Sequence, residues 1–231
     1  MFHWLEKNPF FFAVGVFLVI AFAGLVEILP NFAEASRPVA GLRPYTVLEL
    51  AGKEVYKKDN CIACHSQLIR PFKAETDRYG QYSLSGEYAY DRPFLWGSKR
   101  TGPDLHRVGN YRTTDWHENH MWEPTSVVPG SIMPAYKHQF TNAADIATAY
   151  AEAVTVKNVF HVPYGDDIKA GEKAFDAYKP KILAEAKKVA DQMKNKDVKD
   201  MVAAGKVPEV VALISYLNSL GRSRYEANKV K

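Results

Sequence analysis

The pentapeptide Cys61-Ile62-Ala63-Cys64-His65 constrains this chain more than any other stretch of its sequence. Two cysteines three positions apart, followed directly by a histidine, form the motif to which a c-type haem is attached. Positions i and i+3 of a helical turn face the same way, so both thiols can reach the two vinyl groups of one porphyrin. His65 then sits beside the second thioether and can ligate the iron. The motif predicts one covalent haem c, bound through Cys61 and Cys64.

A zinc site or a redox-active dithiol would also use two cysteines at this spacing. Zinc needs a second pair of Cys or His ligands at a similar spacing, and the chain has only two cysteines. A thioredoxin-like dithiol needs a βαβ setting, and the sequence suggests none. We therefore favour haem attachment over both alternatives. Because it uses both thiols, no disulfide is expected, and maturation should occur outside the cytoplasm, which in a bacterium means the periplasm.

Residues 10–29 form a long apolar stretch, FFFAVGVFLVIAFAGLVEIL. This length is about what a helix needs to cross the hydrocarbon core of a membrane. A cleaved secretory signal is the competing interpretation, but its apolar region is usually shorter, and residues 29–35 offer only a weak cleavage site. We therefore predict an uncleaved, single-pass anchor within residues 1–36. Flanking charges leave its orientation open, whereas the haem motif places residues 37–231 in the periplasm, with the anchor in the inner membrane.

The bulk composition fits a globular domain attached to this anchor. The chain has 231 residues, which allows one ordinary domain with extensions. Hydrophobic residues make up 47% of it, so it can bury a core. The net charge of +4 is modest and no Lys/Arg block stands out, so nucleic-acid binding is not supported.

Two segments of helical periodicity frame the rest of the chain. Residues 47–60 carry apolar or small side chains at i, i+3, i+4 and i+7 and lead into the haem motif. Residues 209–220 form a second amphipathic segment, with Pro208 before it and Gly221 after it as start and stop signals. These patterns predict an all-α fold.

Several of these residues together resemble class I cytochrome c. They are Gly52 before the haem motif and the pair Tyr216-Leu217 in the last helix. In that family the first and last helices cross closely, and the glycine permits the approach. Gly102-Pro103-Asp104-Leu105 matches the Gly-Pro-x-Leu turn of the family, in which the proline carbonyl accepts a hydrogen bond from the proximal histidine. The resemblance therefore implies a hydrogen bond from His65 to Pro103 that orients the imidazole.

The sixth iron ligand must come from further along the chain. Met133 lies in the irregular segment Pro129-Gly130-Ser131-Ile132-Met133-Pro134, which resembles the Met-Pro ligand loop of class I cytochromes c. Met121 lies in a predicted helix and is interpreted as a core residue, and Met193 and Met201 are interpreted as packing residues. Met133 is therefore the predicted ligand. The remaining histidines are interpreted as hydrogen-bonded structural or surface residues: His106, His117, His120, His138 and His161.

The predicted periplasmic domain, residues 37–231, is larger than a compact class I cytochrome and carries two insertions. The first, at about 66–100, is rich in aromatic residues without a sustained period, which suggests a lid over the haem edge or a docking surface for a partner. The second, at about 165–206, is rich in Ala and Lys and predicts one or two solvated helices. We expect no specific partner for the second insertion.

The order of these features resembles subunit II, the membrane-anchored monohaem cytochrome c subunit, of cbb3-type cytochrome c oxidases. The resemblance rests on the tract from Trp116-His117 to Met133-Pro134-Ala135-Tyr136, and on Gln67-Leu68-Ile69-Arg70-Pro71 after the haem motif. It implies two partners, a catalytic membrane subunit with haem b and a haem–copper centre, and a dihaem cytochrome c subunit. It also implies that single electrons pass from the dihaem subunit, or from a soluble cytochrome c, through this chain to the site where O2 is reduced to water.

Two other functions remain as alternatives. The anchored monohaem subunit of a nitric oxide reductase has the same layout, and a freestanding anchored electron carrier would need no stable partner. The tract up to Met133 and the aromatic insertion argue against the reductase. The aromatic insertion also argues against the freestanding carrier, because without a partner it would expose much apolar surface. For the oxidase, a further hypothesis places Ser98, Lys99 and Arg100 near the haem propionates of a partner.

Overall fold

A computed structural model of the chain describes residues 2–33, 38–97 and 100–221. The described residues form helices and contain no β-strand, which confirms the predicted all-α fold. By their internal contacts they separate into two units, Met1–Arg37 and Pro38–Lys231. Each unit is described by itself.

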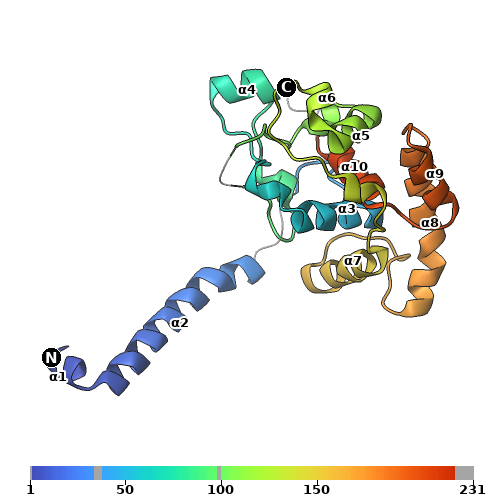
Figure 1. The fold of residues 1–231 in the computed structure, drawn as a ribbon. Coiled ribbons are helices and arrows are strands. Elements are labelled where there is room, and N and C mark those ends of the chain that lie inside the picture. The colour runs from blue at the N-terminus through green and yellow to red at the C-terminus, as the bar shows by residue number, and fades with distance from the viewer. Residues whose placement is uncertain (1, 34–37, 98–99, 222–231) are drawn as a thin grey trace. The chain divides into compact units, whose positions relative to one another are not determined.

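The first unit consists of the short helix α1 (Phe2–Lys7) and the long helix α2 (Pro9–Ala33), shown in Figure 1. The segment Pro9–Leu29 of α2 is apolar and long enough to span a membrane, and none of it is buried within the chain. The predicted apolar helix is therefore present, starting one residue before the predicted segment.

The second unit is built around the crossing of α3 (Val47–Lys58) and α10 (Glu209–Ser219). Thr46 begins α3 with a capping box, because its hydroxyl accepts from the Glu49 N–H while the Glu49 carboxylate accepts from the Thr46 N–H. Where the helices cross, a Cβ on Gly52 would lie 2.0 Å from the carbonyl oxygen of Ala212. Only glycine fits this approach, which confirms the predicted crossing and the reason for it.

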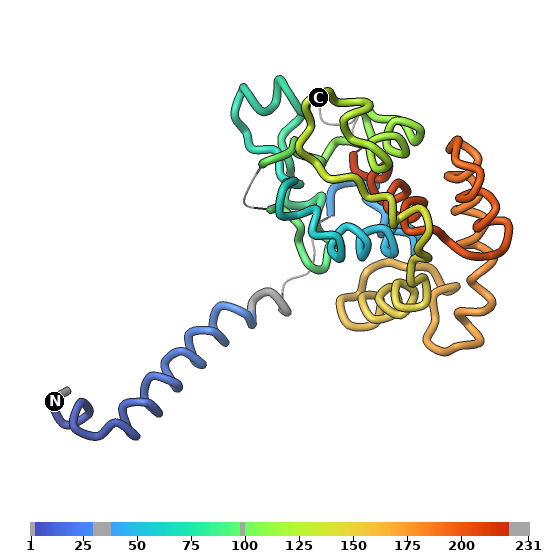
Figure 2. Tube along the Cα trace, in the orientation of Figure 1, coloured from blue at the N-terminus to red at the C-terminus, as the bar shows by residue number. Residues whose placement is uncertain are grey.

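Other helices surround this crossing, as the tube in Figure 2 shows. Helix α7 packs against α3, and α5 packs against both α6 and α10. The turn with the two cysteines, η1, follows α3 directly. The bounds of these and the remaining short elements are η1 Cys61–Ala63, α4 Lys73–Tyr79, η2 Ser85–Tyr88, η3 Val108–Asn110, α5 Thr114–Trp122, α6 Pro124–Val127, η4 Lys137–Phe140 and α7 Ile146–Phe160.

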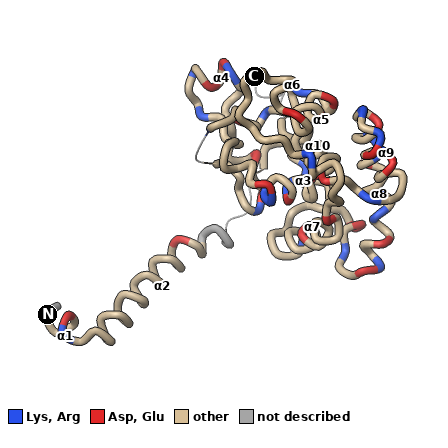
Figure 3. Tube along the Cα trace, viewed as in Figure 1, with Lys and Arg blue, Asp and Glu red and all other residues tan. Residues whose placement is uncertain are grey.

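The second insertion forms two helices, α8 (Glu172–Ala190) and α9 (Lys196–Ala203). Both carry many charged residues along their length, visible in Figure 3. The predicted helices are confirmed, but one face of α8 is buried, which the prediction of solvated helices missed. Ile182, Ala186 and Ala190 recur every four residues on α8 and are buried in the core, where α8 packs against α10 and α3. Small alanines in a Lys-rich segment concealed this apolar stripe.

The described part of the first insertion contains α4 and η2, and two buried carboxylates with arginine partners organise the chain around them. The Glu87 carboxylate accepts from Arg107, and both side chains are buried. The Glu75 carboxylate accepts from Arg70 and from Arg100, the latter at 2.7 Å. Charged groups therefore order this segment, which its aromatic composition did not reveal.

Candidate haem site

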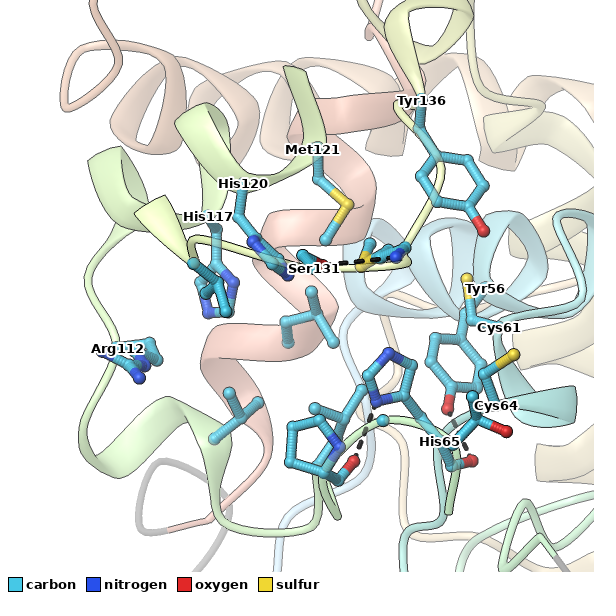
Figure 4. Close-up of a pocket in the computed structure, with 18 of the residues that line it drawn as sticks. Tyr56, Cys61, Cys64, His65, Arg112, His117, His120, Met121, Ser131 and Tyr136 are labelled. Atoms are coloured by element: carbon cyan, nitrogen blue, oxygen red, sulfur yellow. Dashed lines mark hydrogen bonds between the residues drawn. The ribbon is translucent and has the colours of Figure 1, made fainter. Parts of the chain in front are cut away.

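A cavity of about 600 Å³ lies within the second unit, close to the haem motif (Figure 4). Its walls come from α3, the haem motif with η1, the end of α4, residues 101–112, α5, residues 128–136 and α10. The five predicted site residues all line it, although they lie in three separate segments of the sequence: Cys61, Cys64, His65, Pro103 and Met133.

Both thiols stand at one end of this cavity: Cys61 begins the short 3₁₀ turn Cys61–Ala63, and Cys64 caps its C-terminal end. Asn60 precedes the turn in the left-handed conformation, with φ 55°. In a 3₁₀ helix, side chains at i and i+3 eclipse one another, so this turn directs both cysteines the same way. Burial and then the nearby Asp59 carboxylate raise the pKa of Cys61 to about 12, so its thiol stays protonated at neutral pH.

The imidazole of His65 is held from one side by the turn that follows the first insertion. Its Nδ1 donates to the carbonyl oxygen of Pro103 at 2.8 Å, which leaves Nε2 as the unprotonated nitrogen. Burial lowers the pKa of His65, which favours the neutral form that ligates metals. A Cβ on Gly102 would lie 2.3 Å from His65 Cε1, so a side chain there would displace the ring.

The carboxylate of Asp104, buried in the same turn, joins it to the chain after the haem motif. Its Oδ2 accepts from Ser66 Oγ at 2.7 Å and from the Leu68 N–H at 2.8 Å. Its Oδ1 accepts from the His106 N–H at 2.8 Å. These bonds fix the position of the neighbouring Pro103 relative to His65.

Two methionines line the wall that includes residues 128–136 and α5. Met133 is half-buried in the irregular segment, and its N–H donates to Ser131 Oγ at 3.2 Å. Met121 is buried in the hydrophobic core, as predicted, and it also borders the cavity. The structure thus brings both candidate thioethers to the site.

Three of the remaining histidines are structural or surface residues, as predicted. His106 is buried with Nδ1 at 2.6 Å from Ser83 Oγ, and His138 faces Asp59 at 3.1 Å. His161 ends α7 at the surface in the left-handed conformation. For His117 the prediction was wrong, because the side chain is only 2% exposed and neither ring nitrogen has a hydrogen-bond partner among the described residues.

His117 and His120 both line the cavity, three residues apart on α5. This i, i+3 spacing was the signal in the sequence that could have placed both on one face. The Arg112 guanidinium lies 4.2 Å from the ring centroid of Trp116, which in turn stacks on His120 at 4.5 Å. Burial is the main reason that the pKa values of His117 and His120 fall to about 4.

The donor set fits a covalently attached haem. The cavity volume lies in the usual range for cofactor sites. Two thiols stand together, a neutral imidazole presents one nitrogen, and a thioether is available in the same cavity. Within the part of the chain that the structure describes, no three His, Cys, Asp or Glu side chains cluster so that they could bind a metal ion.

A comparison with protein families gives a match that covers most of the chain, whereas a comparison with curated proteins finds no match to the chain. Residues 2–223 match the family described as "Cytochrome C oxidase, mono-heme subunit/FixO". The match includes the apolar helix, the haem motif and both insertions. The chain therefore belongs to the FixO family of monohaem cytochrome c oxidase subunits.

Proposed function

We propose that this chain is the one-electron relay of a cbb3-type oxidase. Cys61 and Cys64 attach a single haem c through thioethers, and His65 and Met133 ligate its iron. The observation that carries this proposal is the convergence of these four residues and Pro103 on one cavity. The chain receives electrons from a dihaem cytochrome c subunit or a soluble cytochrome c and passes them to the catalytic subunit.

The protein supplies binding, orientation and burial at this site. When bound, the haem supplies reversible one-electron redox chemistry, and His/Met ligation raises its potential. The hydrogen bond from His65 to Pro103 sets the tautomer and the ring orientation. The apolar side chains of Leu213 and Leu217 on α10 close one wall against water.

Several features support a role inside a membrane complex. The apolar helix α2 would anchor the chain in the inner membrane, with residues 38–231 on the periplasmic side. Phe94 and Trp96 stack on one another at 4.6 Å and are both about 40% exposed, as expected for a docking surface on the catalytic subunit. Of the three residues expected near the haem propionates of a partner, Ser98 and Lys99 lie outside the described residues. The guanidinium of the third, Arg100, binds Ser66, Leu68 and Glu75 within the chain.

The assignment of Met133 is tested against Met121 by two leucine variants. Met133→Leu should abolish the charge-transfer band of methionine-ligated ferric haem and lower the midpoint potential, while Met121→Leu should keep the band. The opposite pattern would transfer the ligand role to Met121. Covalently bound haem should remain in both variants, because thioether attachment does not need the sixth ligand.

The assignment to an oxidase is tested by purifying the complex from membranes in mild detergent through a tag on this chain. Reduced-minus-oxidised spectra and metal analysis should show haem c, haem b and copper together. Haem b with non-haem iron and no copper would instead identify a nitric oxide reductase. Haem c with no other cofactor would indicate a freestanding carrier and contradict the relay proposal.

A further inference from the structure

The buried ring of His117 needs a partner that the described part of the chain does not provide. A neutral imidazole carries one N–H donor and one acceptor nitrogen. Buried polar groups in native proteins are nearly always hydrogen-bonded. The ring of His117 is 2% exposed, has no bond at either nitrogen among the described residues, and borders the cavity. Its partner is therefore expected to be a group that occupies the cavity.

The charges around His117 select the chemistry of that group. The residues that line the cavity include two arginines, Arg78 and Arg112, and no Asp or Glu. Arg112 stacks on Trp116 and forms no ion pair with a described residue. Stacking holds the guanidinium while leaving its N–H edge available, which is the arrangement that suits bidentate binding of a carboxylate.

These groups stand at the end of the cavity opposite the cysteines. Figure 4 shows Arg112 and His117 on one side and Cys61 and Cys64 on the other, with His65 between them. In the porphyrin of haem c, the two propionates lie on the edge opposite the edge that carries the former vinyl groups. Attachment at Cys61 and Cys64 would therefore direct the propionates toward Arg112 and His117.

We propose that Arg112 and His117 bind a propionate carboxylate of the attached tetrapyrrole, an inference that rests on the haem attachment proposed above. The His117 ring donates one N–H, and Arg112 supplies the neutralising charge. Burial and the neighbouring His120 and Arg112 keep the free ring neutral, with a pKa of about 4, and an anion beside it would raise that pKa. Sequence position alone did not suggest this role for either residue.

The test uses the intact oxidase carrying haem with ¹³C in its carboxyl carbons. Redox-induced infrared difference spectra would be recorded for Arg112→Gln, His117→Phe and His117→Gln. The labelled carboxylate band should move in Arg112→Gln and His117→Phe. It should return toward the wild-type position in His117→Gln, whose amide can still donate. The midpoint potential should fall in Arg112→Gln, because loss of a cation disfavours the reduced state.

Arg70→Gln is the matched control, because Arg70 also stacks on an aromatic ring, Phe72, but does not line the cavity. It should leave both the band and the potential unchanged. A labelled band at the wild-type position in Arg112→Gln, with stoichiometric haem c, would overturn the proposal. Arg112 is exposed, so this variant decides the question even if His117→Phe does not fold. A wild-type protein without covalent haem would instead contradict the proposed function.

Discussion

At the scale of single residues, the contact between Gly102 and the His65 ring leaves no room for a methyl group. A Cβ at position 102 would lie 2.3 Å from His65 Cε1, well inside van der Waals contact. We expect Gly102→Ala to displace the imidazole and weaken its bond to the iron, seen as a mixture of high-spin and low-spin ferric haem in electron paramagnetic resonance. Gly24→Ala, where a Cβ would contact nothing, should leave the spectrum unchanged. A wild-type spectrum for Gly102→Ala would show that the ring is not held against residue 102.

The Glu75 carboxylate gives the first insertion a pH-dependent stability. Hydrogen bonds from Arg100 are the main reason that its pKa falls to about 2. The pKa is lower in the folded state than in the unfolded state, so the stabilisation is complete above the unfolded value of about 4.3 and is lost as the pH falls toward 2. Partial exposure of the arginine partners to solvent limits the effect to about 1 kcal/mol.

We therefore expect Glu75→Gln to lower the free energy of unfolding by about 1 kcal/mol at pH 7, measured by urea denaturation of the haem-loaded protein. The difference from wild type should shrink steadily between pH 5 and pH 2, within the window that the two pKa values define. Asp77→Asn is the control, because Asp77 forms an exposed pair with Lys73 on the same helix. A difference that stays constant down to pH 2 would contradict the ion-pair explanation.

Residues with a strong local motif were the most predictable part of the site. The cysteines, His65 and Pro103 were named from the sequence, and the cavity brings them together. Arg112 was not singled out and His117 was interpreted as a structural or surface residue, because their role depends on a cavity that forms only when α5 packs beside α10. A motif fixes spacing along the chain, whereas burial without a partner is a property of the folded chain.

At the scale of elements, the crossing of α3 and α10 should be the part of the fold most sensitive to a small substitution. A Cβ on Gly52 would meet the Ala212 backbone at 2.0 Å, and a backbone cannot move aside as a flexible side chain can. We expect Gly52→Ala to destabilise the protein by about 3 kcal/mol despite the better helix propensity of alanine, measured by urea denaturation.

Lys188→Ala on the exposed face of α8 is the control for this variant and should change the stability by less than about 0.5 kcal/mol. Stability of Gly52→Ala equal to or above wild type would show that the two helices can separate at little cost.

The sequence predicted the bounds of α3 and α10 to within two residues. Their apolar stripes, cap and stop signals all agree, whereas α8 buries a stripe of small residues that resembles a solvated surface.

At the scale of the whole molecule, the proposed topology predicts which part of the chain a protease can reach. Right-side-out spheroplasts treated with proteinase K should lose residues 38–231, while inverted membrane vesicles should protect them. The haem-stained fragment on a gel would report the outcome directly. Protection in spheroplasts and digestion in inverted vesicles would reverse the proposed orientation. The apolar helix and the family were predictable from the sequence. The proposed direction of the helix across the membrane rests instead on where haem is attached.

The crossing of α3 and α10 also bears on the order of events during biosynthesis, because the two helices lie far apart in the sequence. Lys58 on α3 pairs with Glu209 on α10 across 151 positions of the chain. Under the proposed topology, export delivers the chain from its N-terminal side, so Cys61 and Cys64 emerge long before α10 follows. Until α10 arrives, Leu213 and Leu217 are not in place to close their wall of the cavity, so both thiols would stay accessible for haem attachment. Under the proposed topology and haem attachment, the distance along the chain between the two helices would leave an interval for attaching the haem before α10 closes the cavity.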